Sequence, residues 1–156
     1  MELARNLKID SVSRLQPDEP LVCDRARTIA DAVALMREAR AGCLVVCDDE
    51  GKLSGVFTER DLMRRVIARH LAWTETVESV MTPNPVTVAF KDPIRVAIRR
   101  MEKGGYRNLP VIDEGGRPVG ILSVMRIVHY LVEHFPTAVY NLPPNPHAWP
   151  TKPSGG

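Results

Sequence analysis

The sequence predicts an α+β protein made of two tandem β-α-β-β-α units that pack about a pseudo-twofold axis. The first observation is an internal repeat, because a segment that starts at Gly120 resembles one that starts 65 positions earlier, at Gly55. The second is a regular alternation of short apolar runs, typical of strands, with apolar stripes at helical spacing. The third is size: each unit alone is too small to bury a sufficient core, so we expect the two units to pack together.

The first unit spans residues 20–71 and follows a lead-in at residues 1–19, whose apolar residues suit a short strand or a helical turn. The unit opens with an extended segment at 20–23. Thr28 is the expected N-cap of a helix, with Asp31 three residues later, because a hydroxyl there can accept a hydrogen bond from the first turn. The apolar stripe of this helix is Ile29, Ala32, Val33 and Met36.

Two strands and a second helix complete the first unit. The continuous apolar run at 43–47 predicts a strand buried on both faces. A polar turn leads to another strand over 53–57, and a helix begins after Thr58. The apolar stripe of that helix is Leu62, Met63, Val66 and Ile67. Residues 72–84 link the two units, and we expect a short helix within them, around 76–80.

The second unit, residues 85–136, repeats the first in one register without a gap. Its opening strand at 85–88 corresponds to residues 20–23. Its matching apolar residues are Ile94, Ala97, Ile98 and Met101 in the first helix and Ile127, Val128, Leu131 and Val132 in the second. Residues 137–156 form a tail rich in Pro and Gly, for which we expect a short docking turn at 137–142 and otherwise flexible chain.

Composition restricts the class of function. Of the 156 residues, 44% are hydrophobic and 26% are charged, as in a compact soluble protein. The net charge of +2 disfavours bulk nucleic-acid binding. No apolar run reaches the roughly 20 residues that a membrane helix needs, and no signal-peptide pattern begins the chain. The three cysteines form no CxxC motif and no disulfide framework, so a reducing cytoplasm is the expected location.

Catalytic and metal chemistry finds little support in the sequence. We can place no nucleophile–base pair and no paired catalytic carboxylates, so we expect no catalytic residue and no enzyme activity. The four histidines lack metal-ligand spacing, and we expect no metal and no required cofactor. Cys43 and Cys47 have a spacing that puts them on one face of a strand, too far apart for a disulfide. Arg64, Arg65 and Arg69 are expected on a solvated helix face.

The polar residues best suited to binding a ligand lie where the strand before Thr58 runs into the next helix. Thr58, Arg60 and Asp61 gather at that helix N-terminus. Such an end offers unpaired backbone N–H groups and a partial positive charge, which suit a phosphate. A carboxylate there can accept hydrogen bonds from sugar hydroxyls. Thr58 and Asp61 also have the spacing of a helix cap, like Thr28 and Asp31, and the two roles are compatible.

Three motifs within the repeated units together resemble a known family. They are the Gly55-x-x-Thr58-x-x-Asp61 signature, the segment Val-Met-Thr-Pro-Asn-Pro-Val-Thr-Val at 80–88, and the strand segment at 105–113. Over about residues 8–135 the chain is similar to a tandem cystathionine-beta-synthase (CBS) domain pair, or Bateman module. The resemblance implies a stand-alone regulatory sensor that binds AMP, ADP, ATP or S-adenosylmethionine between the repeats. It also implies a homodimer through the second helix of each repeat, which carries the apolar stripe at 62–67 or 127–132; we call these the late helices. It further implies control of an effector protein.

The resemblance assigns residues to a first cleft. Asp61 would accept hydrogen bonds from the ribose hydroxyls, and Arg107 would donate to phosphate oxygens, as a forked guanidinium can. A solvated or ion-paired Arg107 is the alternative. The full set expected at this ligand is Thr58, Arg60 and Asp61 at the ribose-phosphate, Val86 and Thr87 beside the adenine, and Arg107 and Asn108 near the phosphates.

The second cleft departs from the family pattern. Ser123 keeps the hydroxyl, but Arg126 stands where the ribose-binding carboxylate is expected and cannot accept hydrogen bonds from the sugar. Leu21 and Val22 would line this cleft, where Arg126 either fills the space or holds a phosphate. Gly42 occupies the position of the phosphate-binding arginine. We therefore predict one competent nucleoside site and a second that is empty, weaker or differently used.

Two other interpretations stay open. One is a non-catalytic structural or interaction module with a degenerate cleft, which acts through its dimer and its tail, and the loss of the second carboxylate favours it. The other is an enzyme, which the sequence supports least because no catalytic group can be placed.

Overall fold

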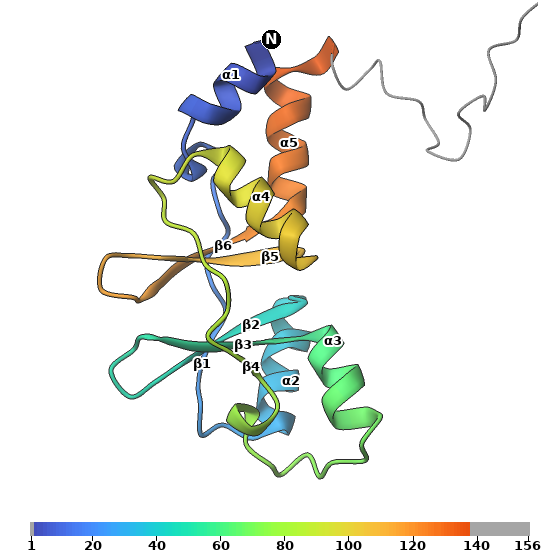
Figure 1. The fold of residues 1–156 in the computed structure, drawn as a ribbon. Coiled ribbons are helices and arrows are strands. Elements are labelled where there is room, and N and C mark those ends of the chain that lie inside the picture. Colours follow the sequence, from blue (N-terminus) through green and yellow to red (C-terminus); the bar gives the residue numbers. More distant parts are fainter. Residues whose placement is uncertain (1, 138–156) are drawn as a thin grey trace, which may run out of the picture.

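The computed structural model describes residues 2–137 of the chain. It has two lobes, each with a sheet covered by helices on its outer side, and the two sheets face each other at the centre (Figure 1). A small apolar cluster lies between the sheets and joins the lobes: Cys43, Val45, Cys47 and Ile121, with Leu53 and Val56 packed against them. The predicted α+β class, with two repeated units about a pseudo-twofold axis, is confirmed.

The first lobe follows the predicted β-α-β-β-α order. Its elements are β1 (Val22–Asp24), α2 (Ile29–Ala39), β2 (Cys43–Cys47), β3 (Leu53–Thr58), α3 (Glu59–Asp61), the π-helical segment η2 (Leu62–Ile67), the 3-10 turn η3 (Val77–Ser79) and β4 (Thr82–Pro83). The strand order is β1-β2-β3-β4, with β1 parallel to β2 and the other neighbours antiparallel. α2 begins at its predicted cap, where Asp31 N donates to Thr28 Oγ1 at 3.1 Å.

The second lobe has a similar order of elements, with one strand reduced. Its elements are α1 (Glu2–Ile9), the 3-10 turn η1 (Val12–Leu15), α4 (Ile94–Gly104), β5 (Asn108–Ile112), β6 (Pro118–Ser123) and α5 (Val124–His134). β5 and β6 are antiparallel. α1 lies beside α4 and α5 on the outer side of this lobe, away from the first lobe (Figure 1).

The first strand predicted for the second lobe is reduced to a single parallel bridge between Val88 and β5. In the first lobe, the corresponding strands are joined by Val45 N, which donates to Leu21 O at 2.8 Å. The residue equivalent to Val45 is Pro110, which has no N–H. The carbonyl of Val86 therefore loses this donor, and the strand shrinks to the one residue that can still pair.

Each core takes in residues from outside its own repeat: the lead-in supplies the second lobe and the linker supplies the first. Val12 and Leu15 belong to the core of the second lobe. Val77 and Val80, which lie 65 positions later, belong to the core of the first lobe. Asp18 forms an antiparallel bridge with β6, as β4 does with β3. The lead-in is thus a structural part of the second lobe, and the linker is a structural part of the first.

The helix predicted after Thr58 is present, but its hydrogen bonds are irregular. α3 is followed by the π-helical η2, where Ala68 N donates to Met63 O, five residues earlier, at 3.0 Å. The equivalent helix α5 is α-helical throughout. π-helical turns are rare and often lie at functional sites. The two halves therefore differ locally where a ligand site is expected.

The structure also bears on several smaller predictions about the cysteines, the linker and the tail. Cys43 and Cys47 are buried on one face of β2, as predicted; this face packs against the other lobe, and both thiols are free. The short helix expected around 76–80 is η3. Among the helices of residues 2–137, none combines the length and the apolar character needed to cross a bilayer. From residue 138 on, the predicted docking turn and tail lie outside the described residues.

Candidate ligand-binding site

Thr58 and Asp61 form a reciprocal cap where β3 ends. Thr58 N donates to Asp61 Oδ2 at 3.0 Å, and Thr58 Oγ1 donates to the same oxygen at 3.1 Å. In return, Asp61 N donates to Thr58 Oγ1 at 3.2 Å. The predicted cap is therefore present. It fixes a carboxylate at the junction of strand and helix, where Asp61 is only 7% exposed and its charge needs partners.

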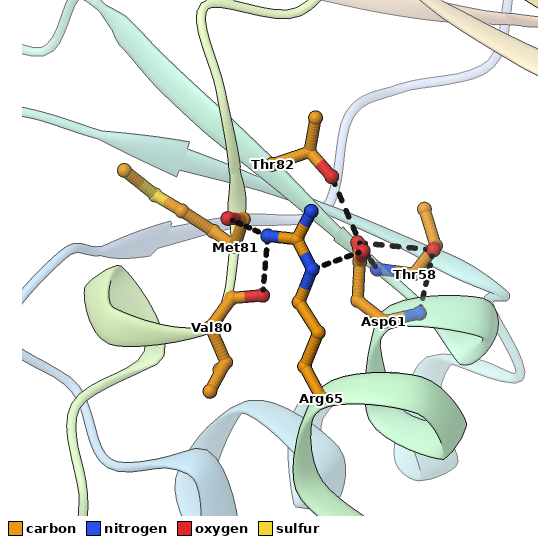
Figure 2. Close-up of polar contacts among 6 residues, drawn as sticks. All are labelled: Thr58, Asp61, Arg65, Val80, Met81 and Thr82. Carbon is orange, nitrogen blue, oxygen red and sulfur yellow. Dashed lines mark hydrogen bonds and ion pairs between the residues drawn. The ribbon is translucent and has the colours of Figure 1, made fainter.

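The second carboxylate oxygen of Asp61 faces the linker (Figure 2). Thr82 Oγ1 donates to Asp61 Oδ1 at 3.1 Å, and Arg65 Nε lies 3.6 Å from the same oxygen. A carboxylate offers about four acceptor positions. Two hydrogen bonds from Thr58 reach Oδ2 and one from Thr82 reaches Oδ1, where Arg65 adds an ion pair, so the charge of Asp61 is balanced within the protein.

Arg65 and Thr82 are the residues at this site that sequence reasoning missed. Nη1 of Arg65 donates to the carbonyl oxygen of Met81 at 2.6 Å and to that of Val80 at 3.4 Å. Arg65 is partly exposed, in keeping with the predicted solvated helix face, but its guanidinium also joins Asp61 to the linker backbone (Figure 2). Its position four residues after Asp61 is the signal that could have found it, because such residues are neighbours on a helix.

Arg60 and Cys43 lie close to this cluster in the fold. Arg60 is exposed in α3, and within residues 2–137 no hydrogen bond or ion pair holds its guanidinium. Cys43 lies opposite Thr58 in the pairing of β2 with β3. Burial, and to a smaller extent the negative charge of Asp61, raise the pKa of the Cys43 thiol to about 11. The thiol therefore stays protonated at neutral pH. Arg60, which is exposed and has no partner in the described residues, is available to bind an anion.

The equivalent junction of the second lobe has the opposite charge arrangement. Ser123 caps α5, since Arg126 N donates to Ser123 Oγ at 3.3 Å. The guanidinium of Arg126 forms an ion pair with Asp18, whose hydrogen bond and charge raise the pKa of the arginine. Arg126 thus ties the start of α5 to the segment on the edge of β6. In the first lobe, Asp61 and Thr82 tie the same two places, with the carboxylate on the helix instead.

The two residues expected near the phosphates lie beside the second junction. The carbonyl of Arg107 accepts a hydrogen bond from the first N–H of α5 at 3.0 Å. Asn108 stands opposite Ser123 in the pairing of β5 with β6. Within residues 2–137, no hydrogen bond or ion pair links either residue to Thr58 or Asp61. Their place at a ligand of the first cleft therefore stays a prediction.

The remaining expected residues lie at or just before the first strand position of each lobe. Val86 is 37% exposed, and the carbonyl of Thr87 accepts from Arg100 Nη1 at 2.6 Å. Thr87 also lines a surface pocket of about 420 Å³. Val22 is 44% exposed, whereas Leu21 is partly buried against the core of the first lobe. In the described part of the chain, no three His, Cys, Asp or Glu side chains come together as a possible metal site.

Comparison with known protein families finds the repeat independently. A family model described as CBS domain matches residues 12–68 and again residues 77–133, so the two matches start 65 positions apart. A CBS domain-containing protein of Arabidopsis thaliana, CBSCBSPB1, is 35% identical over 125 residues, which cover 78% of this chain and 23% of the relative. The chain thus spans about a quarter of the length of that relative.

Solved structures of CBS pairs share the fold over nearly their whole length. CBSX2 in complex with AMP has a TM-score of 0.68 and 26% sequence identity, over 80% of this chain and 97% of CBSX2. The CBS domain pair of protein MJ0100, in complex with 5′-methylthioadenosine and S-adenosyl-L-methionine, has a TM-score of 0.71 and 25% identity, over 78% of this chain and 98% of that one. The two family matches together cover more than half of the sequence, so this chain belongs to the CBS domain family and carries a tandem pair of CBS domains.

Proposed function

We propose that this chain is a regulatory module that binds an adenine nucleotide or adenosyl ligand in the cleft beside Asp61. The candidates are AMP, ADP, ATP and S-adenosylmethionine. The observation that carries the proposal is the buried carboxylate of Asp61, fixed by Thr58 where strand meets helix. Similar CBS pairs bound to AMP, and to 5′-methylthioadenosine with S-adenosyl-L-methionine, support the ligand class. All of these ligands contain a ribose whose two hydroxyls can donate to one carboxylate.

In the proposed complex, each part of the ligand has its own contacts. The ribose hydroxyls donate to Asp61, while Thr58 and the exposed Arg60 face the ribose-phosphate. The other contacts are Val86 and Thr87 at the adenine, and Arg107 and Asn108 at the phosphates. The ligand acts by changing the arrangement of the lobes, or of the dimer, and it can do so only through its different affinity for the two arrangements.

The second cleft is proposed to be empty of nucleoside or to bind it weakly. Its helix offers Arg126 in place of a carboxylate, and Arg126 is already paired with Asp18. A sugar hydroxyl gains no acceptor from a guanidinium. One adenosine-containing ligand per chain is the stoichiometry that we expect.

We propose a homodimer that forms through the late helices. Met63 and Ile67 of η2 are 58% and 45% exposed, and Val128 and Val132, at the equivalent positions of α5, are 39% and 46% exposed. Apolar side chains exposed at matching positions of both lobes give a surface that a second copy of the chain can cover symmetrically. An effector protein would then respond to the shape of this dimer.

Calorimetric titration with the four candidate ligands tests the proposal. Asp61→Asn preserves the size of the side chain but removes its charge and one acceptor oxygen, so we expect at least about tenfold weaker binding. Asp31→Asn is the matched control, because it has the same spacing from a capping threonine and is exposed. Wild-type protein that gives no heat with any of the four ligands at millimolar concentration would reject the proposal.

A structural or interaction module is the second candidate function. The observations in its favour are the internal partners of Asp61, which are three hydrogen bonds and an ion pair, and the replacement of the second carboxylate by Arg126. A protein partner that is captured by the full chain, lost on deletion of residues 137–156 and insensitive to nucleotide would support it. We propose no catalytic role. The three cysteines are free and buried, which suits the reducing cytoplasm proposed as the location.

A further inference from the structure

The two oxygens of the Asp61 carboxylate are held by different parts of the chain. Oδ2 accepts from Thr58, within one turn of the chain, and these bonds keep the start of the helix formed. Oδ1 accepts from Thr82 at 3.1 Å and lies 3.6 Å from Arg65 Nε. Three hydrogen bonds occupy three of the about four acceptor positions of this carboxylate, and Arg65 lies beside Oδ1. A ribose that donates two hydrogen bonds must therefore displace at least one of the three, and that of Thr82 is the one that does not hold the helix cap.

Both partners of Oδ1 connect Asp61 to the linker (Figure 2). Thr82 belongs to β4, a strand of only two residues on the edge of β3. Arg65 Nη1 holds the carbonyls of Val80 and Met81, whose side chains are 1% and 6% exposed. Burial therefore anchors residues 80 and 81 in the first lobe. Beyond them, the chain crosses to the second lobe, and Asp61 holds the first residue of that crossing.

We propose that Thr82 and Arg65 form a latch on Asp61 that the ligand opens. The sugar hydroxyls take over Oδ1, Thr82 is released, and β4 loosens from β3. This inference rests on the proposed function, because it needs a ligand with neighbouring hydroxyls at Asp61. Binding in the first lobe is thereby transmitted to the segment that leads into the second. Thr82 also sets the affinity, because every ligand must break its hydrogen bond.

The second lobe provides an internal contrast to this latch. The ion pair of Arg126 with Asp18 ties the same two places, the start of the late helix and the edge segment. The helix side of this tie has no acceptor that a sugar could take over. A nucleoside therefore cannot open it in the same way, and the response to ligand is confined to the first lobe.

Thr82→Val tests the latch, because valine has nearly the same shape but no hydroxyl. We expect the variant to bind AMP about tenfold more tightly, since the ligand no longer displaces a hydrogen bond to a charged group. Thr76→Val is the matched control in the same linker, because Thr76 is exposed and its side chain makes no helix cap. The affinity of this variant for AMP should equal that of the wild type. If Thr82→Val folds poorly, Arg65→Gln, which removes the ion pair, should also bind more tightly.

Amide hydrogen exchange at Asn84 provides the second readout. Asn84 N donates to Ser54 O at 3.2 Å, so its protection reports whether the linker still lies on β3. AMP should speed its exchange in the wild type, and Thr82→Val should speed it without AMP. Equal or weaker AMP binding by Thr82→Val, or slower exchange with AMP, overturns the latch but leaves wild-type binding, and hence the proposed function, intact. Failure of the wild type to bind AMP and the other three candidate ligands overturns both.

Discussion

Replacing Asp61 by alanine tests how strongly the linker is tied to the late helix of the first lobe. The change removes three accepted hydrogen bonds, two from Thr58 and one from Thr82, and the ion pair with Arg65. Loss of the reciprocal cap costs about 1 kcal/mol, and a hydrogen bond to a charged group contributes about 1.5–3 kcal/mol. The ion pair adds little, because the Arg65 side chain is 39% exposed. We expect the free energy of unfolding to fall by about 3 kcal/mol.

Equilibrium unfolding in urea, at one fixed protein concentration, measures this loss. Asp31→Ala is the control: its cap uses the backbone N–H, and its carboxylate, 54% exposed, pairs with Arg27 at 3.9 Å. Its loss should stay below about 0.5 kcal/mol. A double-mutant cycle of Asp61→Ala with Thr82→Val should show coupling of at least about 1 kcal/mol. Additive effects of the two substitutions, or a loss of unfolding free energy no larger than that of Asp31→Ala, would refute this link between Asp61 and the linker.

Three other predictions concern the dimer, the thiols and the shortened strand. Met63→Lys combined with Val128→Lys should yield a monomer by light scattering, whereas Ile9→Lys, at a residue 65% exposed outside the late helices, should not; a double variant that stays dimeric places the interface elsewhere. The Cys43 thiol, with its pKa raised from 9.0 to about 11, stabilises the fold below pH 9.0, and this contribution is lost as pH rises to about 11. The free energy of unfolding of the wild type should therefore fall by up to about 2 kcal/mol between these pH values. The Cys43→Ala variant lacks the thiol, so its free energy of unfolding should fall by less over the same range. Pro110→Val supplies the missing N–H, so the new amide should exchange slowly with stability changed by less than about 1 kcal/mol, and a fast amide would contradict our account of the strand.

The repeat made most of the fold predictable. Because one register carries strands, stripes and turns through both halves, the predicted run at 43–47 coincides with β2, and the helix capped by Thr28 begins where expected. The packing of the lead-in was not predictable, since apolar residues such as Val12 do not reveal which core they join. Pro110 was visible in the sequence. Its effect depends on the partner carbonyl of Val86, which only the pairing of strands reveals.

The candidate site was predictable only where its contacts are local. The spacing of Thr58 and Asp61 predicts their cap, because both residues lie in one turn. Thr82 meets Asp61 from 21 residues away, along a linker whose path is set by tertiary packing. Asp18 and Arg126 are 108 residues apart. The sequence therefore shows that the second helix lacks the carboxylate, but not that Arg126 pairs with Asp18.

The contacts of Asp61 with Thr82 and of Arg126 with Asp18 explain why the second lobe can lack the carboxylate on its late helix without losing stability. Each lobe must hold the start of its late helix against an edge segment that arrives from elsewhere in the chain. The first lobe does so with the carboxylate of Asp61 on the helix and the hydroxyl of Thr82 on the edge; the second does so with Arg126 on the helix and Asp18 on the edge. Either polarity makes the connection. Only a carboxylate on the helix can also accept from a sugar at the junction, so under the proposed function we expect the polarity of this link to decide which lobe responds to a nucleoside.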